Sequence, residues 1–157
     1  MFLYWALFIS ACAGALGERN RTTGHRLTIP FVFMLILIFT IIAFRWRTGG
    51  DWGNYQRMVE IFRYKDLKSA LLGPDPAFGL SLYLAAHGWG GMLFIQSLSG
   101  AAVTAGLWAF CREQPRPWLA LVVALPYFVI VVGMGYIRQA IAISLFMFGI
   151  NSIYIFR

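Results

Sequence analysis

Charge is scarce in this chain of 157 residues. Asp, Glu, Lys and Arg make up only 12% of it, about half the share of an average soluble domain. Six acidic residues stand against thirteen basic ones, for a formal net charge of +7. No nucleic-acid-binding motif accompanies the basic residues, and we expect no nucleic-acid partner. The basic balance is better explained by anionic lipid headgroups and by the preference of arginine and lysine for cytoplasmic loops.

Cysteine is equally rare. Cys12 and Cys111 lie in or beside apolar runs and lack the spacing of metal ligands, so we interpret them as buried thiols and not as a disulfide. We expect no metal and no cofactor.

Apolar residues are abundant instead, at 60% of the chain. They gather in runs that approach the ~20 residues of a membrane-spanning helix. We therefore predict an all-α, polytopic membrane protein, with residues 1–157 forming a single transmembrane domain. About five spans are predicted, at residues 1–16, 27–44, 91–110, 117–134 and 140–156.

Between the second and third spans lies a long loop with two predicted interfacial helices. Residues 53–72 are amphipathic, and residues 77–87 are apolar but short. Eleven helical residues rise roughly 16 Å, about half the hydrocarbon thickness, so the second helix is not predicted to cross. Asp75 precedes Pro76 and is a candidate cap for that helix.

Arginine placement predicts the topology. The loop at residues 18–26 holds three arginines, and the loop at residues 111–116 holds two, so both should face the cytoplasm. The loop at residues 45–87 and the polar break at residues 135–139 then face outside. This places Asp51 and Arg138 on the same face of the membrane.

The most informative segment begins where the second span ends. Residues 45–51 hold two arginines, two glycines and Asp51, directly after an unbroken apolar run at residues 31–44. Charged groups at the end of a span usually serve a function, because charge exposed to lipid is costly. The composition indicates a site for an anionic ligand at the bilayer surface.

Three motifs in order carry a resemblance to a known family. The chain resembles the EpsG-type exopolysaccharide polymerases, which are Wzy-like membrane glycosyltransferases. The motifs read Arg47-Thr-Gly-Gly-Asp51-Trp52 with Tyr55, then Asp75-Pro-Ala-Phe78, then Arg138-Gln-Ala-Ile-Ala142. The departures from the family pattern are Gly50 for threonine, Trp52 for tyrosine, Asp75 for glutamate and Ala77 for glycine.

This resemblance implies a function and a setting. It implies transfer of polyprenyl-diphosphate-linked sugar repeat units during extracellular polysaccharide synthesis, at the bacterial inner (cytoplasmic) membrane. Family members are longer, so the chain is expected to be an N-terminal portion, GT-C-like in fold and inactive alone. The expected partners are the polyprenyl-diphosphate-linked oligosaccharide, membrane lipids and other polysaccharide-assembly proteins.

Such a transfer needs a base near the acceptor hydroxyl and cations near the departing diphosphate. Asp51 is the candidate base, with capping of the next helix as the alternative. Arg138 is the candidate diphosphate ligand, because its planar fork matches phosphate oxygens, and the alternative is a snorkelling arginine.

Five further residues are candidate substrate ligands, each with an ordinary alternative. Arg45 and Arg47 could hold the carrier phosphate or lipid headgroups. Trp52 and Tyr55 could stack on sugar rings or anchor the chain at the interface. Gln139 could bond a sugar hydroxyl or a neighbouring span.

Two other functions stay open at this point. A transporter of the carrier lipid or polysaccharide would need a cationic central cavity with charges inside the spans, and the predicted spans are almost free of charge. A non-catalytic fragment or assembly partner is the second alternative.

Overall fold

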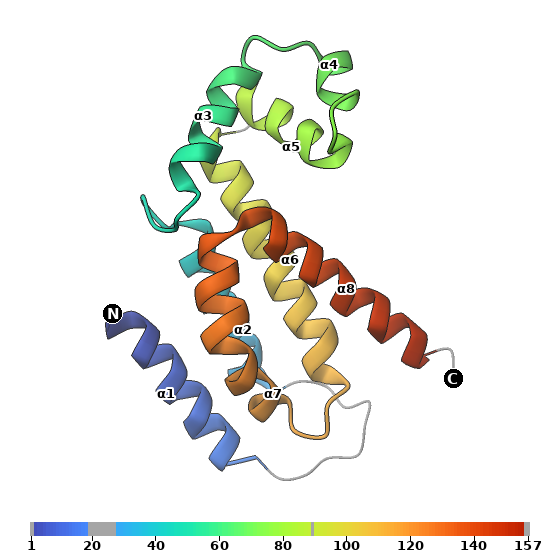
Figure 1. Cartoon of the computed structure of the whole chain (residues 1–157). Coiled ribbons are helices and arrows are strands. Elements are labelled where there is room, and N and C mark those ends of the chain that lie inside the picture. The colour runs from blue at the N-terminus through green and yellow to red at the C-terminus, as the bar shows by residue number, and fades with distance from the viewer. Residues whose placement is uncertain (1, 19–27, 89, 156–157) are drawn as a thin grey trace.

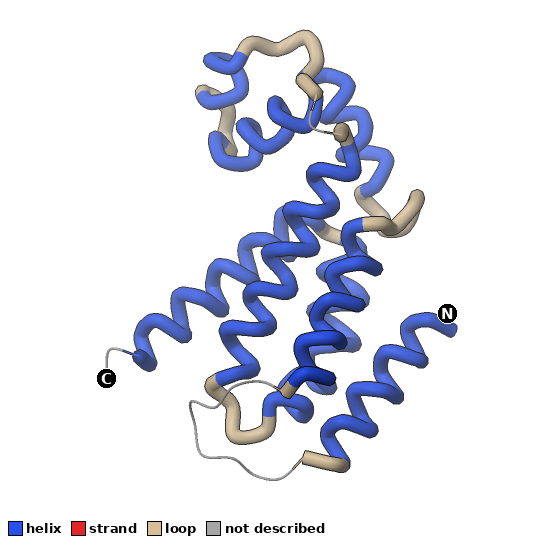
Figure 2. Tube along the Cα trace, turned by 180° about the vertical axis from the view of Figure 1, so that it is seen from behind, coloured by secondary structure: helices blue, strands red, loops and turns tan. Residues whose placement is uncertain are grey.

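The computed structural model describes residues 2–18, 28–88 and 90–155. Within these residues the regular structure is entirely helical, which confirms the all-α prediction for them (Figures 1 and 2). The helices form a bundle and a smaller group at one end of it. The arginines at positions 19, 21 and 26, which the topology prediction uses, lie outside the described residues.

Five helical stretches of the described chain build the bundle, and consecutive ones run in opposite directions (Figure 1). They are α1 (Phe2–Leu16), α2 (Ile29–Ala43), α6 (Met92–Arg112), α7 (Pro117–Ala124) with its continuation η1 (Leu125–Gly133), and α8 (Ile137–Ile155). Helix α6 is central, since it contacts α2 on one side and α8 on another, while α1 packs on α7.

The bundle helices are apolar on both their inner and outer sides. Phe31, Ile38 and Leu107 are completely buried in the core, whereas Phe2 and Val123 are largely exposed. Helices that are apolar all round are buried either in a large protein or in lipid. Among the described residues, α6 is both long enough and apolar enough to cross a membrane, and the shorter apolar segments, of 10–17 residues, include Ile137–Ser152 of α8. The number of spans therefore stays a prediction.

Helices α6 and α8 approach each other closely at Gly106. A Cβ atom at this position would lie 3.0 Å from both the Cα and the Cβ of Ser144 on α8. The Ser144 hydroxyl donates to the Ala140 carbonyl of its own helix, at 2.7 Å. Small residues at a helix crossing allow such close backbone contact. Close packing of this kind is typical of helices in lipid, where no hydrophobic effect drives them together.

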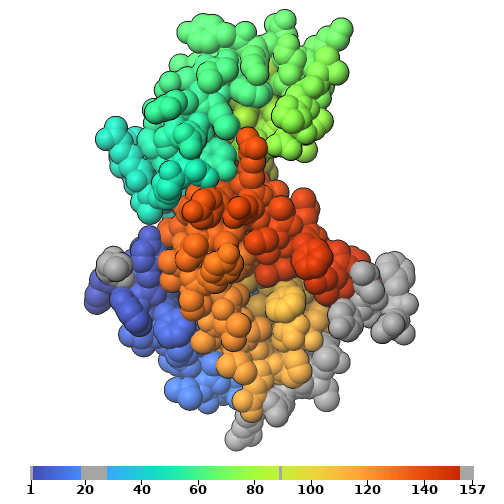
Figure 3. All heavy atoms as spheres, viewed as in Figure 1, coloured from blue at the N-terminus to red at the C-terminus, as the bar shows by residue number. Residues whose placement is uncertain are grey.

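A smaller group of helices lies beyond one end of the bundle, and we call it the head (Figures 1 and 3). It consists of α3 (Trp52–Phe62), α4 (Leu67–Leu71) and α5 (Pro76–Ala86). The predicted single helix at residues 53–72 is wrong, because a turn at residues 63–66 divides it into α3 and α4. Helix α5 stays within the head and, as predicted, is too short to be counted as a span.

The apolar side of α3 faces protein. Tyr55 and Val59 are buried against Leu82 of α5, Ile95 of α6 and Ile137 of α8. The amphipathic pattern predicts a helix at the membrane surface, and this stays a prediction: part of the apolar stripe is covered by other helices, whereas Ile61 is 55% exposed. The head is thus fixed on the bundle by a small core of its own, which positions α3 beside the start of α8.

Two local features shape the end of the bundle that meets the head. The helix after Pro117 becomes π-helical from Leu125 to Gly133, with Pro126 near its start. Proline lacks an N–H and its ring displaces the preceding turn, which favours such a change of hydrogen-bond pattern. Helix α8 then begins at Ile137, so Arg138 and Gln139 lie in its first turn and not in a polar break as predicted.

Candidate functional site

A hollow of about 290 Å³ opens between α3 and the start of α8, and we call it the α3–α8 cavity. Residues from segments about 80 positions apart in the chain meet there. Its lining consists of Asp51, Asn54, Tyr55, Met58, Tyr136, Arg138 and Gln139. Four of these were sequence-predicted site residues: Asp51, Tyr55, Arg138 and Gln139.

Asp51 enters the cavity from the position just before α3. Its backbone carbonyl accepts the first intrahelical bond, from the Tyr55 N–H at 3.1 Å, but its carboxylate makes no capping hydrogen bond. The carboxylate is half-buried and lies 3.5 Å from the Asn54 side-chain nitrogen. Since a cap would place the side-chain oxygen on a backbone N–H, the capping alternative is not what the structure has.

The loop that carries Asp51 packs closely against the backbone of residues 134 and 135, just before α8. Gly49 adopts a φ of +108°, and a Cβ atom there would collide with the backbone carbonyl of Met134. Glycine alone combines this backbone conformation with the absence of a side chain. The requirement at Gly49 therefore explains how Asp51 comes to lie next to the first turn of α8.

Tyr55 forms the floor of the cavity and links α3 to α8. Only 5% of the residue is exposed, and its hydroxyl accepts the backbone N–H of Arg138 at 3.4 Å. Burial raises the pKa of the Tyr55 hydroxyl above its ordinary value, so the group stays protonated at neutral pH. Its ring packs edge-on against Phe78, with 5.8 Å between centroids.

Arg138 presents its guanidinium at the rim of the cavity, and the side chain is 46% exposed. One terminal nitrogen, Nη1, donates to the Asp75 carboxylate at 3.0 Å. The other, Nη2, lies 3.8 Å from the sulfur of Met58, a residue of the cavity wall. The first turn of α8 also brings backbone N–H groups to this end, and a helix N-terminus favours negative charge.

The prediction that Asp75 caps α5 is wrong as far as its side chain is concerned. Asp75 does occupy the position before Pro76, but its carboxylate makes no capping bond and pairs with Arg138 instead. Tertiary contact overrides the local capping preference, because Arg138 brings a full positive charge within reach of the carboxylate.

Trp52 and Arg47 lie beside the cavity without lining it. The ring centroids of Trp52 and Trp46 are 6.1 Å apart. The guanidinium carbon of Arg47 lies 5.9 Å from the Trp52 ring centroid. The indole N–H of Trp52 is buried without a hydrogen-bond partner in the described structure. Trp46 and Arg47 are exposed, so this cluster forms a face next to the cavity on which a sugar ring could stack.

Arg45 lies elsewhere and has a partner within the chain. The residue is 7% exposed, and its guanidinium donates to the Gly133 carbonyl at 2.9 Å. That carbonyl is at the C-terminal end of η1, where positive charge is favourable. Burial lowers the pKa of Arg45 from its ordinary value. The arginine thus ties the end of α2 to the end of η1. It does not line the cavity, although its charge acts on Tyr55, which does.

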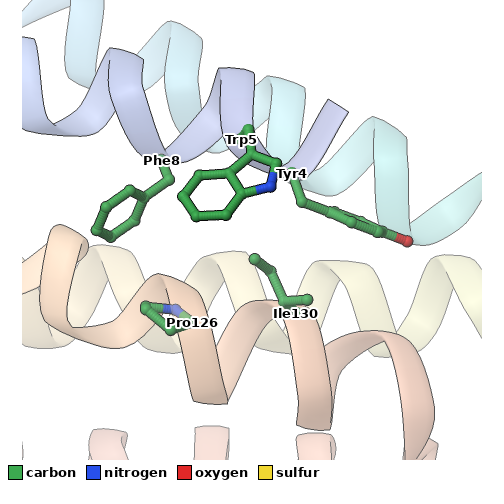
Figure 4. A pocket seen from close by; sticks show the side chains of 5 residues that line it. All are labelled: Tyr4, Trp5, Phe8, Pro126 and Ile130. Carbon is green, nitrogen blue, oxygen red and sulfur yellow. The ribbon is translucent and has the colours of Figure 1, made fainter. Parts of the chain in front are cut away.

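A second hollow differs in chemistry. It measures about 220 Å³ and lies between α1 and η1. Side chains from both helices extend into the gap between them (Figure 4). The walls are formed by Tyr4, Trp5, Phe8, Pro126 and Ile130. Because these walls are apolar and carry no acid or cation, acid–base or anion chemistry is better placed in the α3–α8 cavity.

Sequence reasoning missed Asn54, Met58 and Tyr136. A signal for the first two was present, because positions 51, 54, 55 and 58 follow the i, i+3, i+4, i+7 spacing of one helix face. With Asp51 as the starting point, that spacing selects the side of α3 that faces the cavity. Tyr136 carries no comparable signal.

Comparison with known proteins gives a match to a protein family. Residues 28–157 match the EpsG family, which confirms the resemblance carried by the three motifs. Neither the curated proteins nor the solved structures gave a match.

Proposed function

Because the chain belongs to the EpsG family, we propose that it takes part in exopolysaccharide synthesis by transferring polyprenyl-diphosphate-linked sugar repeat units. The family supports the coarser statement, a membrane-associated role in exopolysaccharide biosynthesis. The transfer step, the carrier substrate, and the multi-pass location in a bacterial inner membrane are the parts that we propose.

The observation that carries the proposal is that Asp51 and Arg138 both line the α3–α8 cavity. A carboxylate and a cation that line one cavity from two different segments can act on the two ends of the same reaction. The Asp51 carboxylate makes no capping bond, and Arg138 lies in the first turn of α8, where a helix N-terminus favours an anion.

In the proposed step, an acceptor sugar hydroxyl binds near Asp51. Its oxygen forms a new bond to the anomeric carbon of the donor sugar, and its proton passes to the Asp51 carboxylate. The bond between that carbon and the diphosphate oxygen breaks, and the diphosphate leaves with the electron pair. The guanidinium of Arg138 stabilises the negative charge that develops on it. Trp52 and Arg47 are proposed to contact the sugar chain, and Gln139 a sugar hydroxyl.

A chain-length assay tests this proposal. Membranes of the native strain, in which the protein is produced from its own full-length gene, are incubated with a radiolabelled polyprenyl-diphosphate repeat unit, and products are separated by size. We expect a ladder of two or more repeat units that is missing from membranes of the deletion strain. If the label changes leaflet without any change in chain length, the protein is a transporter and the transferase proposal fails.

The structure favours transfer over transport in one respect. Buried polar side chains of the described bundle are uncharged except for Arg45 at its end; they are Gln96, Ser99, Ser144 and Asn151. A transporter for an anionic carrier would place cations in the centre of the bundle. The charged side chains that the structure describes lie at the two ends of the bundle and in the head instead.

The proposed orientation puts the head outside the cell. In a Cys12→Ala/Cys111→Ala background, a cysteine at the exposed Lys65 should react with an impermeant maleimide in intact cells. A cysteine at Arg112, at the other end of α6, should react only after permeabilisation. Labelling of Arg112→Cys alone in intact cells would show that the orientation is inverted.

A further inference from the structure

The first turn of α5 holds the guanidinium of Arg138 on two sides. Asp75, just before this helix, binds Nη1 at 3.0 Å. Phe78, three residues later, lies under the guanidinium, with 4.7 Å between the guanidinium carbon and the ring centroid. One helical turn thus supplies an edge contact and a face contact to the same side chain.

This arrangement leaves the second terminal nitrogen of Arg138, Nη2, on the side of the cavity. Asp75 is not part of the cavity wall, whereas Met58, next to Nη2, is. Asp75 therefore restrains Nη1, while Nη2 lies next to a residue of the cavity wall. A long arginine side chain that is 46% exposed would otherwise sample many rotamers, and ordering it in advance lowers the entropic cost of ligand binding.

We infer that Asp75 and Phe78 position Arg138 for a diphosphate, with Asp75 acting as a positioning residue outside the ligand's own contacts. The inference rests on the proposed function, in which Arg138 binds the anion. It differs from a competing view in which Asp75 occupies the anion's place and must be displaced. The two views predict opposite changes in affinity when the Asp75 charge is removed.

The test uses inorganic pyrophosphate as the probe and the purified protein in lipid nanodiscs, with binding measured by calorimetry. Asp75→Asn should weaken binding by about threefold to fivefold, the scale of an exposed ion pair. Loss of a negative charge would by itself strengthen anion binding, so weakening identifies positioning. Asp75→Glu, which keeps the carboxylate, should recover most of the affinity.

Asp66→Asn is the matched control, because Asp66 also precedes a head helix without making a side-chain capping bond. Its affinity should equal that of the wild type, and all variants should unfold within a few degrees of one another. In an Arg138→Gln background, Asp75→Asn should have no further effect, since the coupling acts only through the arginine.

The outcomes separate this inference from the proposed function. If Arg138→Gln binds pyrophosphate as the wild type does, the anion-binding role in the proposed function fails. If Arg138→Gln loses binding while Asp75→Asn leaves it unchanged or tightens it, only the positioning role of Asp75 is overturned. Tighter binding by Asp75→Asn would show that the carboxylate competes for the guanidinium.

Discussion

Long-chain polymer should fall by about 100-fold or more when Asp51 is replaced by asparagine, the scale expected for loss of a general base. Asparagine has almost the same shape and keeps a side-chain oxygen, but it cannot accept the proton of the acceptor hydroxyl. The structure shows no capping bond from the carboxylate, so the substitution should not weaken α3. Polymer yield and size are measured in a deletion strain complemented with the full-length gene carrying each change.

Asp66→Asn serves as the control for Asp51→Asn, because it makes the same chemical change before another helix of the head, away from the cavity. It should give wild-type polymer at equal membrane abundance. Normal chain length from Asp51→Asn at equal expression would remove Asp51 from the reaction and leave the cavity without its proposed base.

Replacing Arg138 by lysine should lower polymer yield by about tenfold or more, although the positive charge is kept. An ammonium cannot donate to Asp75 with one nitrogen while presenting a second nitrogen to the cavity, as the guanidinium does. It also lacks the flat surface that lies over Phe78. Yield in the complemented strain, normalised to the amount of protein in the membrane, is the measurement.

Arg57→Lys is the matched control for Arg138→Lys, since Arg57 is an exposed arginine on α3 that does not line the cavity. Its yield should match the wild type. If Arg138→Lys performs as well as this control, the site needs only a positive charge, and the fork geometry contributes nothing.

The elements of the fold were largely readable from the chain itself. Apolar runs, prolines at helix starts and the Gly-rich break at residues 88–91 predicted the helices to within a few residues, apart from the division of residues 53–72. That division escaped because residues 63–66, where α3 ends, include no glycine or proline that would mark the end of a helix. The π-helical stretch of η1 also escaped, since a proline predicts a disturbance and not its form.

Four of the seven residues that line the cavity were predicted from the sequence, but their contacts were not. Topology placed Asp51 and Arg138 on one face of the membrane, and both line one cavity. Arg45 shows the limit of this reasoning: it lies two residues from Arg47 in the same charged patch, yet its guanidinium is buried against Gly133. Neighbours in sequence at the end of a helix can point to opposite sides of the chain, which composition does not reveal.

Sequence by itself determined the helical class, the family and the ends of the bundle at which charge gathers, because hydrophobic runs and short motifs are local properties. Tertiary structure alone decided which acid meets which cation. Asp75 is 63 residues from Arg138, and a local rule assigned it to a helix cap. Packing of α3 and α5 on the start of α8 brought the two side chains together, and a full charge 3.0 Å away outweighs a backbone N–H in the same turn.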